Sequence, residues 1–217
     1  MTRNRPGWTK DVKNINNSMR AIGFKRLLHL QKNPTMSEVI QWTNDVVEEC
    51  EKRDAGSEKK RPLLLFLMGH GCTSGIYDSK MKVFNEELLI SALNTPSMND
   101  RLKIMTLVSC RGFRQPRSIL CDDCPSSQQP IQNLVIFYSA LKGFLSKRRS
   151  EEGVPFIEEL CKELRNKYHK WSIVKIFHFV KSRLKKFQIN KIRYNLTPDM
   201  KLYNVSLKYQ KIAMAFL

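Results

Sequence analysis

Apolar residues recur at helical spacing near the start of the chain. A helix is predicted over residues 11–22, because Ile15, Met19 and Ile22 fall on one face of it. Residues 23–30 then have the composition of a strand. This helix and strand begin an alternation that continues along the chain.

A second helix is predicted after the break at Asn33-Pro34. Thr35 and Glu38 form the S/T-x-x-E capping box that starts a helix, and the apolar spacing continues to about Arg53. The polar residues 54–61 that follow predict a loop.

A continuous apolar run of strand length comes next, at residues 62–68. Because such a run is apolar on both faces, it is typical of a buried strand in the middle of a sheet covered by helices. Residues 102–108, which are also mostly apolar, predict a second central strand. A short helix is predicted between them, over residues 83–93. The alternation of helices and strands predicts the α/β fold class.

The composition agrees with a globular protein. The chain has 217 residues, of which 41% are hydrophobic and 27% charged, so we expect one good core in one domain. The chain has no run of 18 apolar residues, and its first residues do not have the pattern of a signal peptide. We therefore expect a cytoplasmic protein without a membrane span.

The charge is strongly positive and unevenly placed. Lys and Arg number 38 against 20 Asp and Glu, a formal net charge of +18, and 18 basic but 6 acidic residues lie from Ala140 onward. A basic surface can attract nucleic acid, acidic lipid or acidic protein. The alternative is the solvated face of packed helices, which the spacing of residues 181–187 favours. We expect neither nucleic acid nor a membrane as the partner.

The cysteines give a weak metal signal. Cys121 and Cys124 have CxxC spacing, but no second pair of Cys or His follows at the distance of a zinc ribbon. The sequence also lacks the secretory signal that would favour a disulfide framework. We expect no metal and no cofactor.

A reactive residue follows each of the two apolar runs, His70 after the first and Cys110 after the second. Catalytic groups in α/β sheets gather beyond the carboxyl ends of parallel strands, where an imidazole could activate a neighbouring thiol. Glycines after both residues would let backbone N–H groups approach a developing oxyanion. The alternative is a structural cysteine with a capping histidine.

The residues around this pair resemble a known family. Gly69-His70-Gly71, followed by Ser109-Cys110-Arg111-Gly112, is similar to the motifs of the caspase family of cysteine peptidases. Other segments resemble its substrate-binding and subunit-pairing segments: Arg5-Pro6-Gly7, Phe137-Tyr138-Ser139-Ala140, Ser146-Lys147-Arg148-Arg149-Ser150 and residues 201–208. The resemblance covers almost the whole chain and implies a three-layer α/β/α fold with a mostly parallel central sheet.

The resemblance also implies roles for individual residues. His70 and Cys110 match the catalytic dyad, and the N–H groups of Gly71 and Cys110 match the oxyanion hole. Arg5 and Arg148 match two arginines that bind a substrate aspartate, since a buried carboxylate needs charge-assisted partners. Further substrate-binding positions are implied at Val108, Ser146 and Lys147.

The family pattern divides the chain into three parts. Residues 1–112 correspond to the large subunit, 113–133 to the linker between subunits, and 134–217 to the small subunit. Asp122 and Asp123 match the place where that linker is cut. The implied partners are protein substrates containing aspartate, and a second copy or a related caspase.

Some positions depart from the family. Val108 stands where the family has Gln, Gly69 where it has Ser, and Lys147 where it has an aromatic residue. We also expect no prodomain and no apolar strand before the Arg5 segment. Two functions therefore stay open: an endopeptidase cleaving after aspartate, in apoptosis or a related proteolytic cascade, or a weakly active or inactive homologue that binds a procaspase and regulates its activation.

Overall fold

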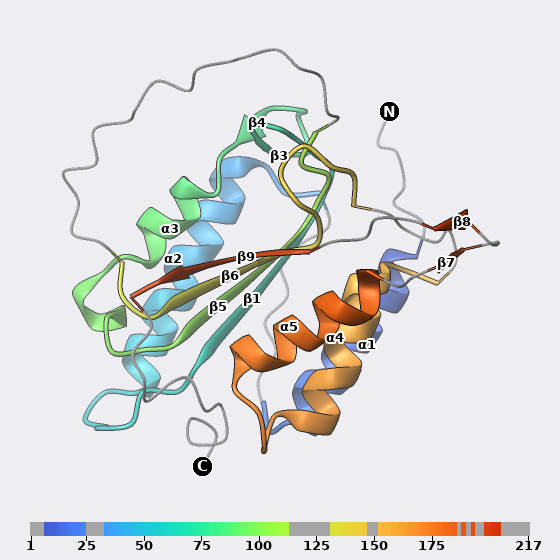
Figure 1. Cartoon of the computed structure of the whole chain (residues 1–217). Coiled ribbons are helices and arrows are strands. Elements are labelled where there is room, and N and C mark those ends of the chain that lie inside the picture. Colours follow the sequence, from blue (N-terminus) through green and yellow to red (C-terminus); the bar gives the residue numbers. More distant parts are fainter. Residues whose placement is uncertain are drawn as a thin grey trace.

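The computed structural model describes residues 7–24, 33–112, 131–146, 152–185, 188–189, 192–193 and 198–204. The α-helices in these residues are α1 (Trp8–Ala21), α2 (Met36–Arg53), α3 (Glu87–Leu93), α4 (Pro155–Lys167) and α5 (Ile173–Lys185), as shown in Figure 1. The strands are β1 (Leu63–Met68), β2 (Gly71–Cys72), β3 (Gly75–Tyr77), β4 (Val83–Phe84), β5 (Lys103–Val108), β6 (Leu134–Tyr138), β7 (Gln188–Ile189), β8 (Ile192–Arg193) and β9 (Asp199–Tyr203).

The main sheet has the strand order β1-β5-β6-β9. β1 pairs with β5 and β5 with β6 in parallel, whereas β9 runs antiparallel to β6. A small antiparallel sheet of β2, β3 and β4 follows directly after β1. The prediction of a mostly parallel central sheet is confirmed.

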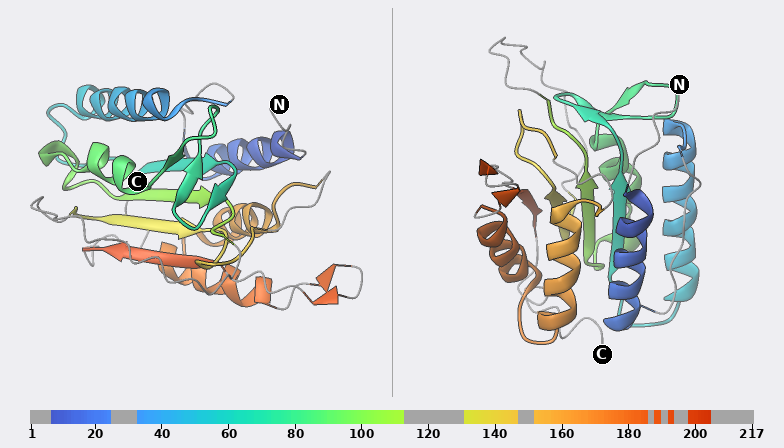
Figure 2. Two further views of the ribbon diagram at one scale, coloured as in Figure 1. Left: turned by 90° about the horizontal axis from the view of Figure 1, so that it is seen from above. Right: turned by 90° about the vertical axis from the view of Figure 1, so that its right-hand side faces the viewer.

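Helices cover both faces of this sheet, as Figures 1 and 2 show. Successive residues of a strand point to opposite faces. Ile104 and Phe137 accordingly belong to an apolar cluster shared with α1, α4 and α5, whereas Met105 and Ile136 belong to a second cluster with α2 and α3. The three-layer α/β/α fold is therefore confirmed.

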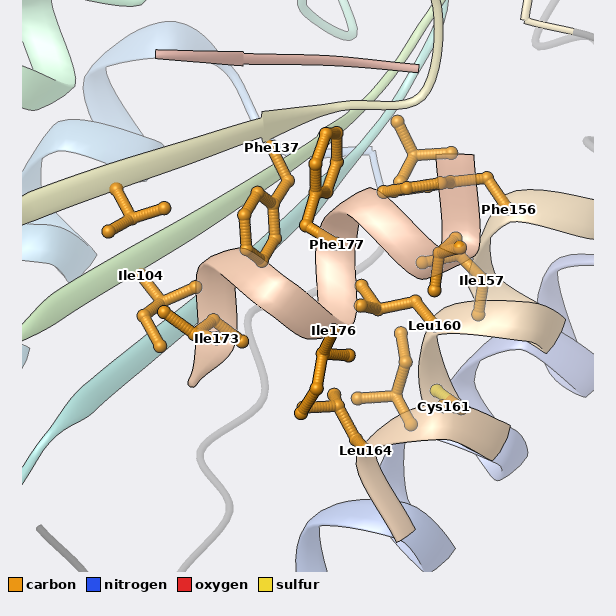
Figure 3. Packing of buried hydrophobic residues seen from close by; sticks show 14 of the residues in the cluster. Ile104, Phe137, Phe156, Ile157, Leu160, Cys161, Leu164, Ile173, Ile176 and Phe177 are labelled. Atoms are coloured by element: carbon orange, nitrogen blue, oxygen red, sulfur yellow. The ribbon is translucent and has the colours of Figure 1, made fainter. Parts of the chain in front are cut away.

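Stacked aromatic rings join β6 to the helices in the first of these clusters. The rings of Phe137 and Phe177 stack with centroids 4.6 Å apart, and Phe156 meets Phe177 edge-on at 6.2 Å (Figure 3). Such pairs add about 0.5–1.5 kcal/mol beyond the burial of their area. This packing fixes α4 and α5 against the strand that leads to the candidate site.

The first two helix predictions are confirmed. α1 begins three residues earlier than predicted and buries Ile15 and Met19. At the start of α2 the capping box is present: the Glu38 N–H donates to Thr35 Oγ1 at 3.3 Å, and the Thr35 N–H donates to Glu38 Oε2 at 2.6 Å.

One sequence prediction was wrong in part. Residues 83–93 form strand β4 and then α3, because Val83 and Phe84 pair with β3 and Asn85 Oδ1 accepts from the Glu87 N–H at 3.2 Å. β1 was predicted in the middle of the sheet, and this stays a prediction, because β5 is its one strand neighbour among the described residues and most of the strand predicted over 23–30 lies outside them. β1 is accordingly only partly buried, whereas all of β5 is buried.

The remaining predictions fall partly outside the described residues. Of the predicted strand over 23–30, only Gly23 and Phe24 are described, and they follow α1 as a turn and an irregular residue. The basic run 181–187 is helical up to Lys185, with Leu184 buried. In the part of the chain that is described, no helix is both long and apolar enough to cross a membrane.

Candidate active site

Strand register brings His70 and Cys110 to equivalent positions. The last pair between the parallel strands β1 and β5 joins Met68 to Val108, and the Gly69 N–H continues the pairing by donating to the Val108 carbonyl at 3.1 Å. His70 and Cys110 each lie two residues beyond this pair. His70 is exposed and Cys110 partly buried, at the carboxyl ends of neighbouring strands.

The segment after His70 packs tightly against the cysteine loop. A Cβ atom added to Gly71 would lie 2.4 Å from the Cys110 carbonyl oxygen, so only glycine fits there. Gly112 has φ +98°, and a Cβ on it would lie 2.2 Å from Thr73 Oγ1. These two glycines let the two backbone segments meet. The sequence prediction that they also let N–H groups approach an oxyanion stays a prediction.

The small sheet holds the histidine segment from its other side. The Tyr77 N–H donates to the His70 carbonyl at 2.9 Å. An interaction of the Tyr77 hydroxyl with Cys72 raises the pKa of Tyr77. His70 is therefore carried on a hairpin that stands over the end of the main sheet (Figure 1).

Asp78 fixes the turn that follows this hairpin strand. Its Oδ1 accepts from the N–H groups of Lys80 and Lys82, each at 2.8 Å, and its Oδ2 accepts from the Met36 N–H at 3.2 Å. Burial alone would raise the pKa of Asp78, but these backbone donors outweigh it and hold that pKa below its usual value. The carboxylate thus ties the hairpin to the start of α2.

A loop from the other half of the chain closes over the cysteine. The Arg111 N–H donates to the Phe144 carbonyl at 2.9 Å, and the Gly143 N–H donates to the Arg111 carbonyl at 2.9 Å. Cys110 Sγ lies 4.0 Å from the carbonyl oxygen of Ser146, to which the thiol can donate. Residues 110–111 and residues 143–146 are therefore held together by backbone as well as side-chain contacts.

The side chain of Arg111 anchors this arrangement to the last strand. Its guanidinium lies 3.8 Å from the ring centroid of Tyr138, with Nη1 3.3 Å from Asp199 Oδ2 and 3.5 Å from the Ala140 carbonyl. A stacked, ion-paired guanidinium uses its plane and its charge together. Arg111 thus connects the residue after the cysteine with β6 and β9.

Tyr138 extends the same network to the segment before α3. Its hydroxyl donates to Glu86 Oε1 at 2.7 Å, and Lys201 Nζ lies 3.0 Å from the same oxygen. Burial, followed by the charge of Glu86, raises the pKa of Tyr138 far above its usual value. The phenol therefore stays a neutral donor at physiological pH.

Several predicted site residues lie outside the described residues, namely Arg5, Asp122, Asp123, Lys147 and Arg148. Of the others, His70, Gly71, Cys110 and Ser146 are brought to one end of the sheet. Val108 is also near that end, but it is fully buried in the apolar cluster of α1, α4 and α5.

Sequence reasoning missed the roles of Arg111, Tyr138, Ser139 and Asp199 at the site. Arg111 was noticed as part of a motif and Ser139 as part of a strand, but spacing along the chain does not indicate what their side chains contact. Position along the chain was the available signal. Ser139 comes directly after the buried strand β6, just as Ser109 and Cys110 come directly after its neighbour β5.

The described residues contain no group of three or more His, Cys, Asp or Glu side chains that could hold a metal ion. Cys121 and Cys124, the pair with CxxC spacing, lie outside the described residues.

Comparisons with known proteins agree with this geometry. The chain is 22% identical to caspase b of Danio rerio over 216 residues, covering 95% of the chain and 52% of the relative. It is 25% identical to caspase-1 of Spodoptera frugiperda over 189 residues, covering 82% of the chain and 60% of the relative. The chain thus spans about half the length of the curated relatives it matches.

Solved structures give the same fold. The crystal structure of caspase-1 from Spodoptera frugiperda superposes with a TM-score of 0.73 at 20% sequence identity, covering 91% of this chain and 79% of the other. The caspase domain matches residues 1–203. With the histidine and cysteine segments packed together on this fold, the chain belongs to the caspase family of cysteine peptidases.

Proposed function

We propose that this protein is a cysteine endopeptidase that cleaves protein substrates after aspartate. The observation that supports the proposal is the close approach of Gly71 to the Cys110 carbonyl, together with the strand register, in which His70 and Cys110 each follow the last pair by two residues. A base must come near hydrogen-bonding reach of its nucleophile, and neighbouring parallel strands lie only about 4.8 Å apart.

The chemistry divides between these residues. The Cys110 thiolate attacks the carbonyl carbon of the scissile peptide, whose electron pair moves to the oxygen, and the N–H groups of Gly71 and Cys110 stabilise that oxyanion. The tetrahedral intermediate then collapses: the C–N bond breaks, His70 gives the leaving amine the proton that it took from the Cys110 thiol, and a thioester remains on Cys110. Water, activated by His70, then hydrolyses the thioester and restores the thiol.

Arg5 and Arg148 would bind the substrate aspartate with their guanidinium groups. The contacts between their neighbouring segments support this assignment. Asp11 Oδ1 accepts from the Val154 N–H at 2.8 Å, and a Cβ on Gly153 would lie 2.3 Å from the same oxygen. The start of α1, just after Arg5, therefore lies against residues that follow Arg148.

The proposal includes processing and association. The linker 113–133 would be cut at Asp122 or Asp123, and the protein would act in the cytoplasm in apoptosis or a related cascade. Residues 201–208 would pair with a second copy or a related caspase. Supporting this, Leu202 lies on β9, at the edge of the described sheet, with 50% of its surface exposed.

One observation favours a second candidate, a regulator that binds a procaspase and has little activity itself. Val108, where relatives have a hydrogen-bonding Gln, is 0% exposed and packs among apolar side chains. A missing hydrogen bond to a charged group costs about 1.5–3 kcal/mol, or roughly ten- to a hundredfold in rate. Val108→Gln should raise activity if this loss limits the enzyme.

The decisive experiment is active-site titration with a covalent inhibitor that carries aspartate at the cleavage position. We expect stoichiometric labelling of the native chain and none of Cys110→Ala. Cys72→Ala is the matched control, because Cys72 is a partly buried cysteine two residues from His70.

Labelling of Cys72→Ala should equal that of the native chain. If the inhibitor does not label the native chain, and the native chain inhibits processing of a related procaspase, the regulator becomes the favoured function. Labelling that survives Cys110→Ala would contradict the nucleophile assignment.

A further inference from the structure

Ser139 lies at the end of β6, beside the loop of residues 109–112 that carries Cys110. Its N–H donates to the Leu107 carbonyl at 3.0 Å, which extends the pairing of β5 and β6 by one residue. Ser139 is 7% exposed, so its hydroxyl has few alternatives to protein partners. The backbone of Ser139 is therefore held next to the carboxyl end of β5. Cys110 lies three residues after Leu107, just beyond that end.

The hydroxyl of Ser139 reaches the loop that closes over the cysteine. It donates to Ser146 Oγ at 2.7 Å, while the Ser109 carbonyl at 3.5 Å is the longer alternative acceptor. A hydroxyl has one proton, so the shorter contact takes it. The hydrogen bond joins a buried strand end to residue 146 of the loop.

Ser146 is the residue of the 143–146 loop that lies next to Cys110. Its carbonyl oxygen lies 4.0 Å from Cys110 Sγ. The loop is held a second time at Gly143 and Phe144, whose backbone groups bond Arg111. Ser146 also directly precedes Lys147 and Arg148, which the proposed function assigns to substrate binding.

We propose that Ser139 is a positioning residue, which sets the place of the substrate-binding loop through its hydroxyl bond to Ser146. This inference rests on the proposed function and deepens it. With the bond present, the loop is ordered before the substrate arrives. Without it, substrate binding must order the loop, and that cost lowers affinity rather than the rate of the chemical step.

The test compares Ser139→Thr with Ser139→Val, two side chains of the same shape that differ by the hydroxyl. Both would be assayed on a fluorogenic peptide ending in aspartate. We expect KM to be about two- to tenfold higher for Ser139→Val, the range of one ordinary hydrogen bond, with kcat within about twofold. Ser139→Ala against the native chain repeats the comparison without added volume, in case the extra methyl prevents folding.

Equal KM values for the threonine and valine variants would overturn the proposal. A fall in kcat with KM unchanged would also overturn it, because the hydroxyl would then act on the chemical step. A merely structural role would shift the thermal midpoint without separating KM from kcat.

A second measurement does not depend on peptidase activity. If the native chain neither cleaves the peptide nor reacts with the aspartyl inhibitor, the proposed function fails. The positioning role of Ser139 is then tested by the rate at which iodoacetamide labels Cys110. A released loop should uncover the thiol, so we expect labelling of Cys110, located by peptide mass, to be about two- to tenfold faster in Ser139→Val than in Ser139→Thr. Equal labelling rates would refute the positioning role.

Discussion

The two ends of the central sheet use the same kind of ion pair differently. Before β5, Arg101 and Asp54 pair at 2.8 Å, and their side chains are 1% and 2% exposed. After β5, Arg111 and Asp199 pair at 3.3 Å, with 13% and 34% exposed. The first pair is buried where the strands begin, and the second lies beside the Cys110 segment, open to solvent.

The sealed pair connects several segments through the backbone. Arg101 donates to the carbonyl groups of Cys50 and Arg61, and so joins the end of α2 to the residues before β1. Burial alone would raise the pKa of Asp54, but the Arg61 N–H and the charge of Arg101 outweigh it and lower that pKa. Both charges therefore persist at neutral pH.

The open pair has less to contribute to folding, because solvent screens it. It instead joins the residue after Cys110 to a strand far along the chain. The contrast is therefore between a buried pair that stabilises the fold and a solvent-exposed pair that positions the backbone next to Cys110.

The largest expected effect is at the sealed end. Asp54→Ala leaves Arg101 charged and buried, and should lower the free energy of unfolding in urea by about 3–5 kcal/mol. The double variant Asp54→Leu with Arg101→Met should recover most of this loss, since it buries no charge. Lys52→Ala is the control: its pair with Glu48 is 75% and 68% exposed, and should contribute less than about 1 kcal/mol.

The single and double variants also test the interpretation that the Arg101–Asp54 pair stabilises the fold and has no role in activity. An Asp54→Ala protein as stable as the native chain would contradict it. So would a loss of inhibitor labelling at temperatures where that variant remains folded.

A smaller effect concerns Lys103, buried next to this pair. Its Nζ donates to the carbonyl groups of Met98 and Arg101, and burial, reinforced by the charge of Arg101, lowers its pKa from 10.5 to about 8. Between these pH values the unfolded chain binds the proton that the folded protein has lost, so stability should rise with pH, by at most about 3 kcal/mol.

Urea unfolding at about pH 7.5 and about pH 9.5 measures this rise, and Lys103→Met supplies the control. The native chain should gain stability relative to Lys103→Met at the higher pH. If the free energy of unfolding of the native chain minus that of Lys103→Met stays constant or falls as the pH rises, Lys103 keeps an ordinary pKa.

The sequence predicted the parts of the fold that local pattern determines. The capping box at Thr35 and the two apolar runs fixed α2, β1 and β5, because capping and continuous apolarity act over a few residues. It missed the division between β4 and α3, where Val83 and Phe84 are recruited by pairing with a strand that local pattern does not reveal. The order of the strands was not predictable in the same way, since length and apolarity do not encode strand order.

The candidate site, like the fold, was predictable from the sequence only in part. Reactive residues after two predicted strands singled out His70 and Cys110 as candidates, since parallel strands bring their carboxyl ends to one edge. The partners of these segments were not predictable. Arg111 meets Asp199 across 88 residues of sequence, and only the fold brings them together.

The smallest effect on stability, and the sharpest test of the contrast, is at the open end. Arg111→Lys keeps the charge but loses the planar stacking on Tyr138, so the residue after Cys110 is held less firmly. We expect kcat/KM on an aspartyl peptide to fall about tenfold, equivalent to about 1.4 kcal/mol, while the free energy of unfolding changes by less than about 1 kcal/mol. Arg53→Lys, in the Arg53–Asp54 pair at the sealed end, is the matched control and should leave kcat/KM unchanged. If Arg111→Lys instead lost stability and kept its activity, the open pair would be structural after all, and the difference between the two ends would disappear.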